Sequence, residues 1–140
     1  MKMLQIFLVG LIIGIGPVSG SFAGDEGLEV VAVDAAGWES FGRAVAVSDT
    51  AKYALVGAPR ANAGEGAALE DAGAVYPYVR KGEVWEDDVP FRIGALPPVG
   101  VDNFGFSVSM SGNTAIVGCP GRDDGAEDSG AAYILIRTGD

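Results

Sequence analysis

The residues best suited to hold a cation lie in one short acidic segment, GRDDGAEDS, at residues 121–129. It contains Asp123, Asp124, Glu127 and Asp128. Ca²⁺ prefers several oxygen ligands, so clustered carboxylates are candidates for calcium binding. Their spacing matches no standard calcium loop and is more typical of a solvated acidic turn. We therefore predict no metal site, with weak calcium binding by Asp123, Asp124 and Asp128 as the alternative.

Catalytic chemistry has few candidate residues in this sequence. None of the 140 residues is histidine, which excludes Ser-His-Asp and Cys-His systems and every His-ligated metal. The one cysteine, Cys119, has no base to activate it and is interpreted as a small buried residue rather than a reactive thiol. The carboxylates around Trp85 are interpreted as a solvated face that protects a sheet edge, rather than as a glycosidase pair; they are Glu83, Glu86, Asp87 and Asp88. We predict no catalytic and no cofactor-binding residue.

Charge and tryptophan content narrow the class of partner. The formal net charge is −10 and there is no basic cluster, which argues against nucleic acid and against anionic membrane surfaces. Trp38 and Trp85 are each interpreted as packing residues, with ligand stacking as the alternative.

The elements that position these residues occur twice. Residues 41–80 read FGRAVAVSDTAKYALVGAPRANAGEGAALEDAGAVYPYVR, and residues 104–137 read FGFSVSMSGNTAIVGCPGRDDGAEDSGAAYILIR. They align when the first copy is given two extra residues before Gly57 and a loop of different length after Pro59. The aligned pairs are Phe41 with Phe104, Gly42 with Gly105, Val45 with Val108, Ser48 with Ser111, Ala54 with Ala115, Val56 with Val117, Gly57 with Gly118, Pro59 with Pro120, Gly73 with Gly130, Tyr76 with Tyr133 and Arg80 with Arg137. An internal repeat indicates a fold assembled from similar units.

Both copies predict β-strands. Phe106, Val108 and Met110 alternate with serines at the two-residue period of a strand. We predict strands near 28–34, 41–48, 52–57, 73–80, 90–96, 104–111, 113–118 and 130–137. Pro77 lacks an amide donor, so the strand that contains it is expected to be bulged or weakly paired there.

Two motifs in each copy identify a family resemblance. They are Phe41-Gly42 with Gly57-Ala58-Pro59, and Phe104-Gly105 with Gly118-Cys119-Pro120. These resemble the FG-GAP repeat, the blade unit of the integrin-alpha-type β-propeller. The resemblance implies an all-β fold of two four-stranded antiparallel blades, a partial β-propeller, with blade one at about 41–96, blade two at about 104–137 and an extra outer strand at 28–34.

The resemblance does not extend to calcium. In the integrin-type blade, a loop with several aspartates lies just before the second strand and holds the ion. Residues 48–52 contain one carboxylate here, and residues 111–114 contain none. The family's calcium site is therefore not expected in either copy.

The open edges of two blades need partners. We expect residues 28–34 to form a ladder with residues 131–137 and so complete the second sheet, because unpaired edges promote aggregation. The two sheets would then pack face to face through Val45, Val47, Phe106, Val108 and Met110. In the competing arrangement, residues 131–137 remain an open edge that recruits another copy of the chain.

The N-terminal segment predicts export. Residues 1–23 resemble a signal peptide, with Lys2 first, then an apolar run over 4–18 and Ser21-Phe22-Ala23 as the cleavage site. The run is shorter than the ~20 residues that span a bilayer, and the alternative is an uncleaved anchor, the one case in which membrane contact is expected. The signal peptide is expected to be helical, and residues 24–140 form the repeat domain of a secreted, extracellular or periplasmic protein.

We interpret the chain as a secreted or cell-surface, non-catalytic module for protein or glycan interaction, such as adhesion. Its variable loops, 60–72 and 121–129, are the expected location of function. One alternative is an accessory propeller fragment of a larger secreted enzyme. Another is a truncated gene product without independent function, because propellers typically close with ~4–8 blades.

Overall fold

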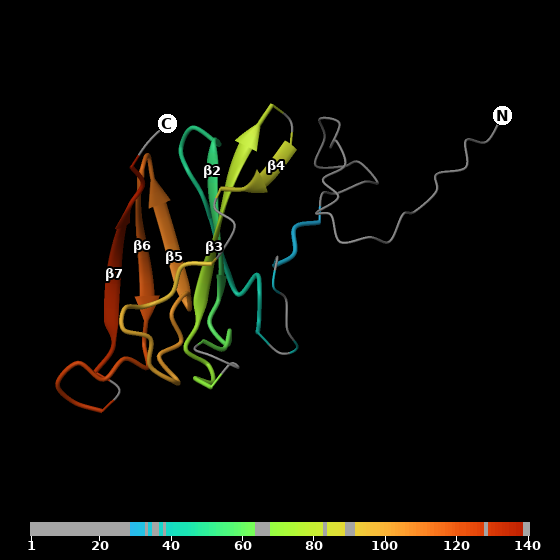
Figure 1. The fold of residues 1–140 in the computed structure, drawn as a ribbon. Coiled ribbons are helices and arrows are strands. Elements are labelled where there is room, and N and C mark those ends of the chain that lie inside the picture. Colours follow the sequence, from blue (N-terminus) through green and yellow to red (C-terminus); the bar gives the residue numbers. More distant parts are fainter. Residues whose placement is uncertain are drawn as a thin grey trace.

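The computed structural model describes residues 29–32, 34, 37, 39–63, 68–82, 84–88, 92–127 and 129–138. The expected signal peptide, with its helix, lies outside these residues. The described part of the chain is all-β (Figure 1). Within it, no helix is long and apolar enough to cross a bilayer.

Two antiparallel sheets follow each other along the chain (Figure 1). The first has the order β1-β2-β3-β4, formed by Ala44–Val47, Tyr53–Ala58, Ala74–Lys81 and Val84–Asp87. The second has the order β5-β6-β7, formed by Ser107–Ser111, Thr114–Cys119 and Ala131–Ile136. The predicted all-β, two-sheet fold is confirmed, but the described second sheet has three strands rather than four.

The two copies of the repeat have the same strand register. In the first sheet Val56 is paired with both Val45 and Tyr76, and in the second Val117 is paired with both Val108 and Tyr133. The phenylalanine of each motif meets the tyrosine of its own sheet edge-on, at 5.3 Å between the ring centroids in the first sheet and 5.2 Å in the second. The sequence repeat is therefore a structural repeat.

The sheets pack face to face through a surface that was only half predicted. Val108 belongs to the inter-sheet core and Met110 lines a cavity beside it, as expected. Val45 and Val47 are instead 67% and 53% exposed, on the opposite face of the first sheet. On the first-sheet side, Val75 contributes to this core. The two sheets are stacked in the same orientation, so the second sheet packs against the face of the first that is opposite to Val45 and Val47.

The outer strand of the first sheet lies earlier than predicted. The fourth strand is β4, at Val84–Asp87, and the described residues 92–96 form no strand. Ile93 makes a single bridge to Val75, with both N–H···O distances at 2.8 Å. The outer edge of β3 is thus covered in two separate pieces.

Pro77 lies at the junction between these two pieces. Its register with Leu55 on β2 is uninterrupted, so the expected bulge is absent from that ladder. The carbonyl of Pro77 accepts a hydrogen bond from the Asp88 amide at 2.9 Å, on the outer side of the strand. An amide hydrogen at Pro77 would point to the same outer side, where the ladder with β4 has already ended. Its absence therefore removes no hydrogen bond to β2.

The N-terminal segment covers the first sheet rather than completing the second. Its described residues, 29–32 and 34, form no strand and make no ladder with β7, so the predicted pairing is wrong for them. Tyr78 donates a hydrogen bond to the Val31 carbonyl at 3.2 Å, and Tyr76 donates to the Asp34 carboxylate at 2.7 Å. Buried tyrosine hydroxyls need acceptors, and this segment supplies them. No described segment pairs with the outer edge of β7.

Candidate functional site

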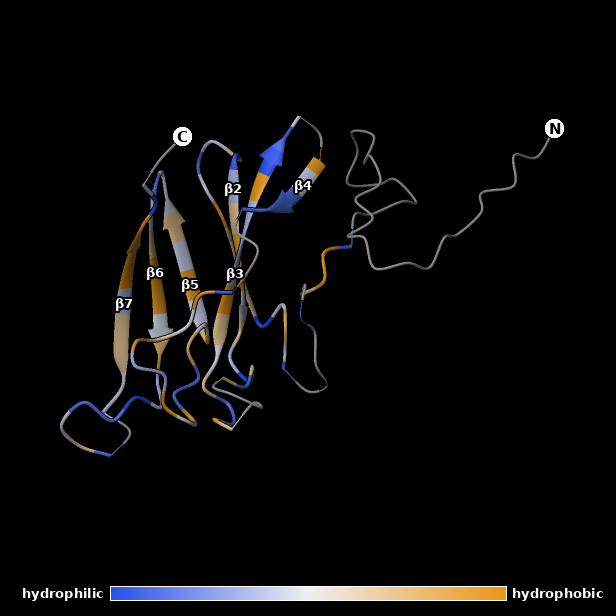
Figure 2. Cartoon of the chain, in the orientation of Figure 1, coloured by the Kyte–Doolittle hydropathy of each residue, from blue (hydrophilic) through white to orange (hydrophobic). Residues whose placement is uncertain are grey.

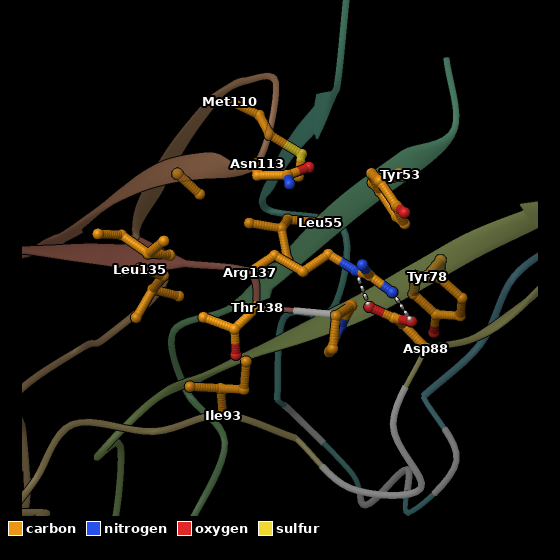
Figure 3. Close-up of a pocket in the computed structure, with 14 residues that line it drawn as sticks. Tyr53, Leu55, Tyr78, Asp88, Ile93, Met110, Asn113, Leu135, Arg137 and Thr138 are labelled. Carbon is orange, nitrogen blue, oxygen red and sulfur yellow. Dashed lines mark hydrogen bonds and ion pairs between the residues drawn. The ribbon is translucent and has the colours of Figure 1, made fainter. Parts of the chain in front are cut away.

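A cavity of about 400 Å³ opens between the two sheets (Figure 3). Most of its wall is apolar, and the charged groups, Asp88 and Arg137, lie together at one side (Figure 3). Its lining residues include Tyr53, Leu55, Tyr78, Asp88, Ile93, Met110, Asn113, Ala115, Leu135 and Arg137. Pockets that combine apolar walls with a few convergent polar groups are the usual binding sites of proteins.

Strand register aligns the wall on the second sheet. Met110 on β5, Ala115 on β6 and Leu135 on β7 are direct partners in one row across the sheet. Leu55 on β2 faces this row from the first sheet (Figure 3). Because a small alanine separates two larger side chains, the row has a hollow in its middle.

An ion pair joins the two sheets at the polar side of the cavity. Arg137 donates from Nε and Nη2 to the two carboxylate oxygens of Asp88, at 2.9 and 3.1 Å (Figure 3). Bidentate pairs of this kind are the stronger and more directional ones. The guanidinium also lies over the Tyr53 ring, 4.1 Å from its centroid. The pair and the ring form a fixed polar mouth beside an apolar interior.

The groups at this cavity suit binding better than acid–base chemistry. Burial raises the pKa of Tyr78, and its hydroxyl donates to a backbone carbonyl, so it remains protonated at neutral pH. Asp88 and Arg137 are engaged with each other. The described lining contains no nucleophile beside a base, the arrangement that covalent catalysis requires.

The acidic segment after β6 does not gather into a metal site in the described part of the chain. Asp124 binds Nε of Arg122 at 3.2 Å, and the same guanidinium binds Asp102 at 3.0 Å. Asp128 lies outside the described residues. Within them, no cluster of three or more histidine, cysteine or acidic side chains is placed to hold a metal. Figure 2 shows the described part of this loop as mainly hydrophilic.

Cys119 is buried, as predicted. The residue is 1% exposed, and its thiol donates to the Asp102 carbonyl at 3.2 Å. Burial raises the pKa of this thiol to about 11. The thiolate, which is the nucleophilic form, is therefore scarce at neutral pH.

The residues around Trp85 were only partly understood from sequence. Trp85 packs against the core of the first sheet, as predicted, whereas Trp38 lies outside the described residues. Glu86 pairs with Lys81 at 2.8 Å on the surface. Asp88, which was interpreted as a solvated residue, instead forms the ion pair with Arg137. Sequence did not reveal that pair because its two members lie in different repeats.

A buried carboxylate two residues before each Phe-Gly motif was also missed. Glu39 and Asp102 are 6% and 1% exposed and occupy equivalent positions in the two copies. Each is bound by an arginine, Glu39 by Arg92 at 3.4 Å and Asp102 by Arg122 at 3.0 Å. The signal was present in the sequence as the matching pair ESFG and DNFG.

Comparison with known families agrees with this geometry. The profile of the FG-GAP repeat matches residues 28–78 and 99–135, which together make up more than half of the chain. A comparison with curated proteins found none that matches. The two matched stretches contain the two motif pairs and the strands that share one register. On these grounds the chain belongs to the FG-GAP repeat family.

Proposed function

We propose that this chain is an extracellular, non-catalytic interaction module of the β-propeller type, which binds a partner protein at the cavity between its two sheets. FG-GAP repeats suggest a propeller-type module that is often extracellular and interaction-related, and the family is generally non-catalytic. Export through residues 1–23 is part of the proposal. The observation that carries it is the cavity, with its apolar interior and fixed polar mouth.

The cavity supplies the two components of a protein recognition site. Its interior, between Leu55 and the row of Met110, Ala115 and Leu135, accommodates an apolar side chain. Side chains that anchor a protein interface are usually buried in pockets of this kind, while polar groups at the rim fix their orientation. The pair of Asp88 and Arg137 provides that rim, because it offers hydrogen-bonding atoms at a fixed position.

A partner protein fits this cavity better than a glycan does. Sugars usually stack on an open aromatic face, and the aromatic residues that line the cavity are Tyr53 and Tyr78, which are only 6% and 2% exposed. The Tyr53 ring is also covered by the guanidinium of Arg137 at 4.1 Å, and the Lys52 ammonium lies 5.2 Å from the ring centroid. The remaining wall is mainly aliphatic and offers few groups for sugar hydroxyls.

Peptide selection with a pocket-filling variant tests the proposal. A displayed random-peptide library is selected against the purified chain, and enriched peptides are measured against two variants. Ala115→Met fills the hollow in the row, while Thr114→Met makes the same kind of change at an exposed neighbour. We expect enriched peptides that bind Ala115→Met at least tenfold more weakly and Thr114→Met unchanged. Equal binding to both variants would contradict the proposal, as would a chain that enriches no peptide but retains ligands on a glycan array.

A further inference from the structure

The second sheet has an open apolar face. Ile116, Ile134 and Ile136 are 50%, 66% and 69% exposed, and all three point away from the first sheet. We call the surface formed by Ile116, Ile134 and Ile136 the distal face. Large exposed apolar patches on a folded protein mark interaction surfaces.

The repeat identifies what covers the equivalent surface in the first sheet. By the alignment, Ile116 corresponds to Leu55 and Ile136 to Val79. Leu55 and Val79 are 5% and 9% exposed, and Leu55 lies on the face of the first sheet that packs against the second. The distal face is therefore the position at which one further sheet would pack in the same way.

Two glycines of the first sheet provide the space into which the backbone of the second sheet packs. Gly57 and Gly73 leave room for the Phe104-Gly105 backbone, since a Cβ on Gly57 would lie 2.1 Å from the Gly105 carbonyl oxygen. A Cβ on Gly73 would lie 2.2 Å from the Phe104 backbone. Only glycine allows two backbones to approach so closely.

On the second sheet, the equivalent space beside Gly118 and Gly130 holds no backbone from another sheet in the described part of the chain. A Cβ on Gly130 would approach the Pro120 carbonyl only at 3.4 Å. A Cβ on Gly118 would meet a side chain of its own sheet, the Ser107 hydroxyl at 2.3 Å. Neither glycine is close to a Phe-Gly backbone from another sheet, although both belong to the same motif as Gly57 and Gly73.

The first sheet has its own Phe-Gly backbone, at Gly42, which packs against no other sheet in the described part of the chain. Gly42 and Gly105 have the same backbone conformation, with φ of 86° and 88°. A Cβ on Gly105 would lie 2.3 Å from the Ala74 carbonyl, whereas one on Gly42 would meet nothing within 4 Å. Val45 and Val47, which correspond to Val108 and Met110, are likewise exposed. We call the surface formed by Gly42, Val45 and Val47 the proximal face.

We propose that copies of this chain stack head to tail, with the proximal face of one copy seated on the distal face of the next. The occupant is a second copy because the chain carries both halves of the contact, and its own two sheets already make that contact once. Strand β5 lies against β1 inside the chain, so β1 of the incoming copy lies against β5. The described N-terminal residues, 29–32 and 34, cover Tyr76 and Tyr78, whereas Val45 and Val47 on β1 are exposed.

Contacts between unlike surfaces form rings when the rotation closes and filaments when it does not. Propellers close with ~4–8 blades, so two sheets per copy correspond to a ring of about two to four copies. This stacking buries sheet faces. It differs from pairing through the open edge of β7, which would leave the proximal face exposed.

Paired charge variants test the proposal. Ile134→Lys places a charge on the distal face, and Val45→Lys places one on the proximal face, while Leu96→Lys is a control at an apolar residue that is 85% exposed in the connection between the sheets. The chain is expressed with its own N-terminus, its processed mass is determined, and light scattering after size exclusion gives the molar mass across a range of concentrations. Melting curves confirm that each variant is folded.

The expected masses follow from the two unlike faces. The unmodified chain and Leu96→Lys exceed the mass of one chain, while Ile134→Lys and Val45→Lys each remain single. A mixture of the two variants forms a dimer and nothing larger, because each retains the face that the other lacks. A single-chain mass for the unmodified protein at all concentrations overturns the proposal. A Val45→Lys variant that still associates, or a mixture that stays monomeric, overturns the head-to-tail arrangement.

Discussion

Replacing Gly105 by alanine should weaken the contact between the two sheets, and replacing Gly42 should not. The two glycines occupy the same motif position with nearly the same φ, so both variants carry the same left-handed backbone strain. That strain costs about 1–2 kcal/mol. Only the Gly105→Ala methyl would also meet backbone from the other sheet, 2.3 Å from the Ala74 carbonyl oxygen.

The added methyl has to push the sheets apart. Restoring an ordinary carbon–oxygen contact requires a movement of roughly 1 Å, and a gap of that size forfeits a quarter to a half of the dispersion energy across it. Overpacking of this kind typically costs about 1–3 kcal/mol. Gly105→Ala should therefore lower the free energy of unfolding by about 2–5 kcal/mol, and Gly42→Ala by about 1–2 kcal/mol.

Urea unfolding followed by tryptophan fluorescence measures both changes. The concentration is kept low enough for the unmodified protein to be a single chain, and the variants are compared at equal m-value. The difference between the two variants isolates the inter-sheet contact from the backbone strain. Equal losses, or a larger loss in Gly42→Ala, would refute the idea that the Phe-Gly backbone seats the second sheet on the first.

Three further predictions concern buried charge, alkaline pH and export. Asp102→Ala should lower the melting temperature by roughly 10 °C because it leaves the buried Arg122 without its buried carboxylate partner. Asp124→Ala removes an exposed partner of the same arginine and should lower the melting temperature by less than ~3 °C. Equal shifts in calorimetry would contradict this. Burial raises the pKa of Cys119 from 9.0 to about 11, and burial also raises the pKa of Tyr76, so the unfolded chain loses these protons at lower pH than the folded chain does. The free energy of unfolding should therefore be highest below pH 9 and fall as the pH rises toward 11. Cys119→Ala should reduce this fall in urea titrations, and an unchanged dependence on pH would contradict the prediction. Mass spectrometry of exported protein should find a chain that begins after Ala23, and a retained Met1 would show that the predicted cleavage does not occur.

Local pattern predicted the fold well wherever the information lay within one repeat. Two-residue alternation and the repeated glycines located the strands of each copy, and the shared register of Val56 and Val117 follows from that regularity. The outer strands were harder to predict. Residues 90–96 have strand-like composition, yet β4 precedes them, because Pro77 and the end of the ladder at Tyr78 divide the edge of β3 into two pieces.

The candidate site was beyond sequence reasoning for a different reason. Its cavity lies between the repeats, and its ion pair joins Asp88 of the first sheet to Arg137 of the second. Alternation identifies two faces of a strand but does not say which face meets a neighbour. For that reason Val45 and Val47 were assigned to the contact between the sheets, whereas they lie on the face turned away from it.

The outer edge of β7, which no described segment covers, also has a consequence for aggregation. The strand reads AAYILI, a six-residue window with no charge, no proline and no glycine, and no described segment pairs with its outer side. Segments of this composition are the ones that stack into cross-β fibrils when exposed. Arg137 follows the strand directly and is held by Asp88, which places a fixed charge at the end of the window. Natural sequences flank such strands with gatekeeper charges, and Arg137 occupies the position of one while it also joins the two sheets in the folded protein.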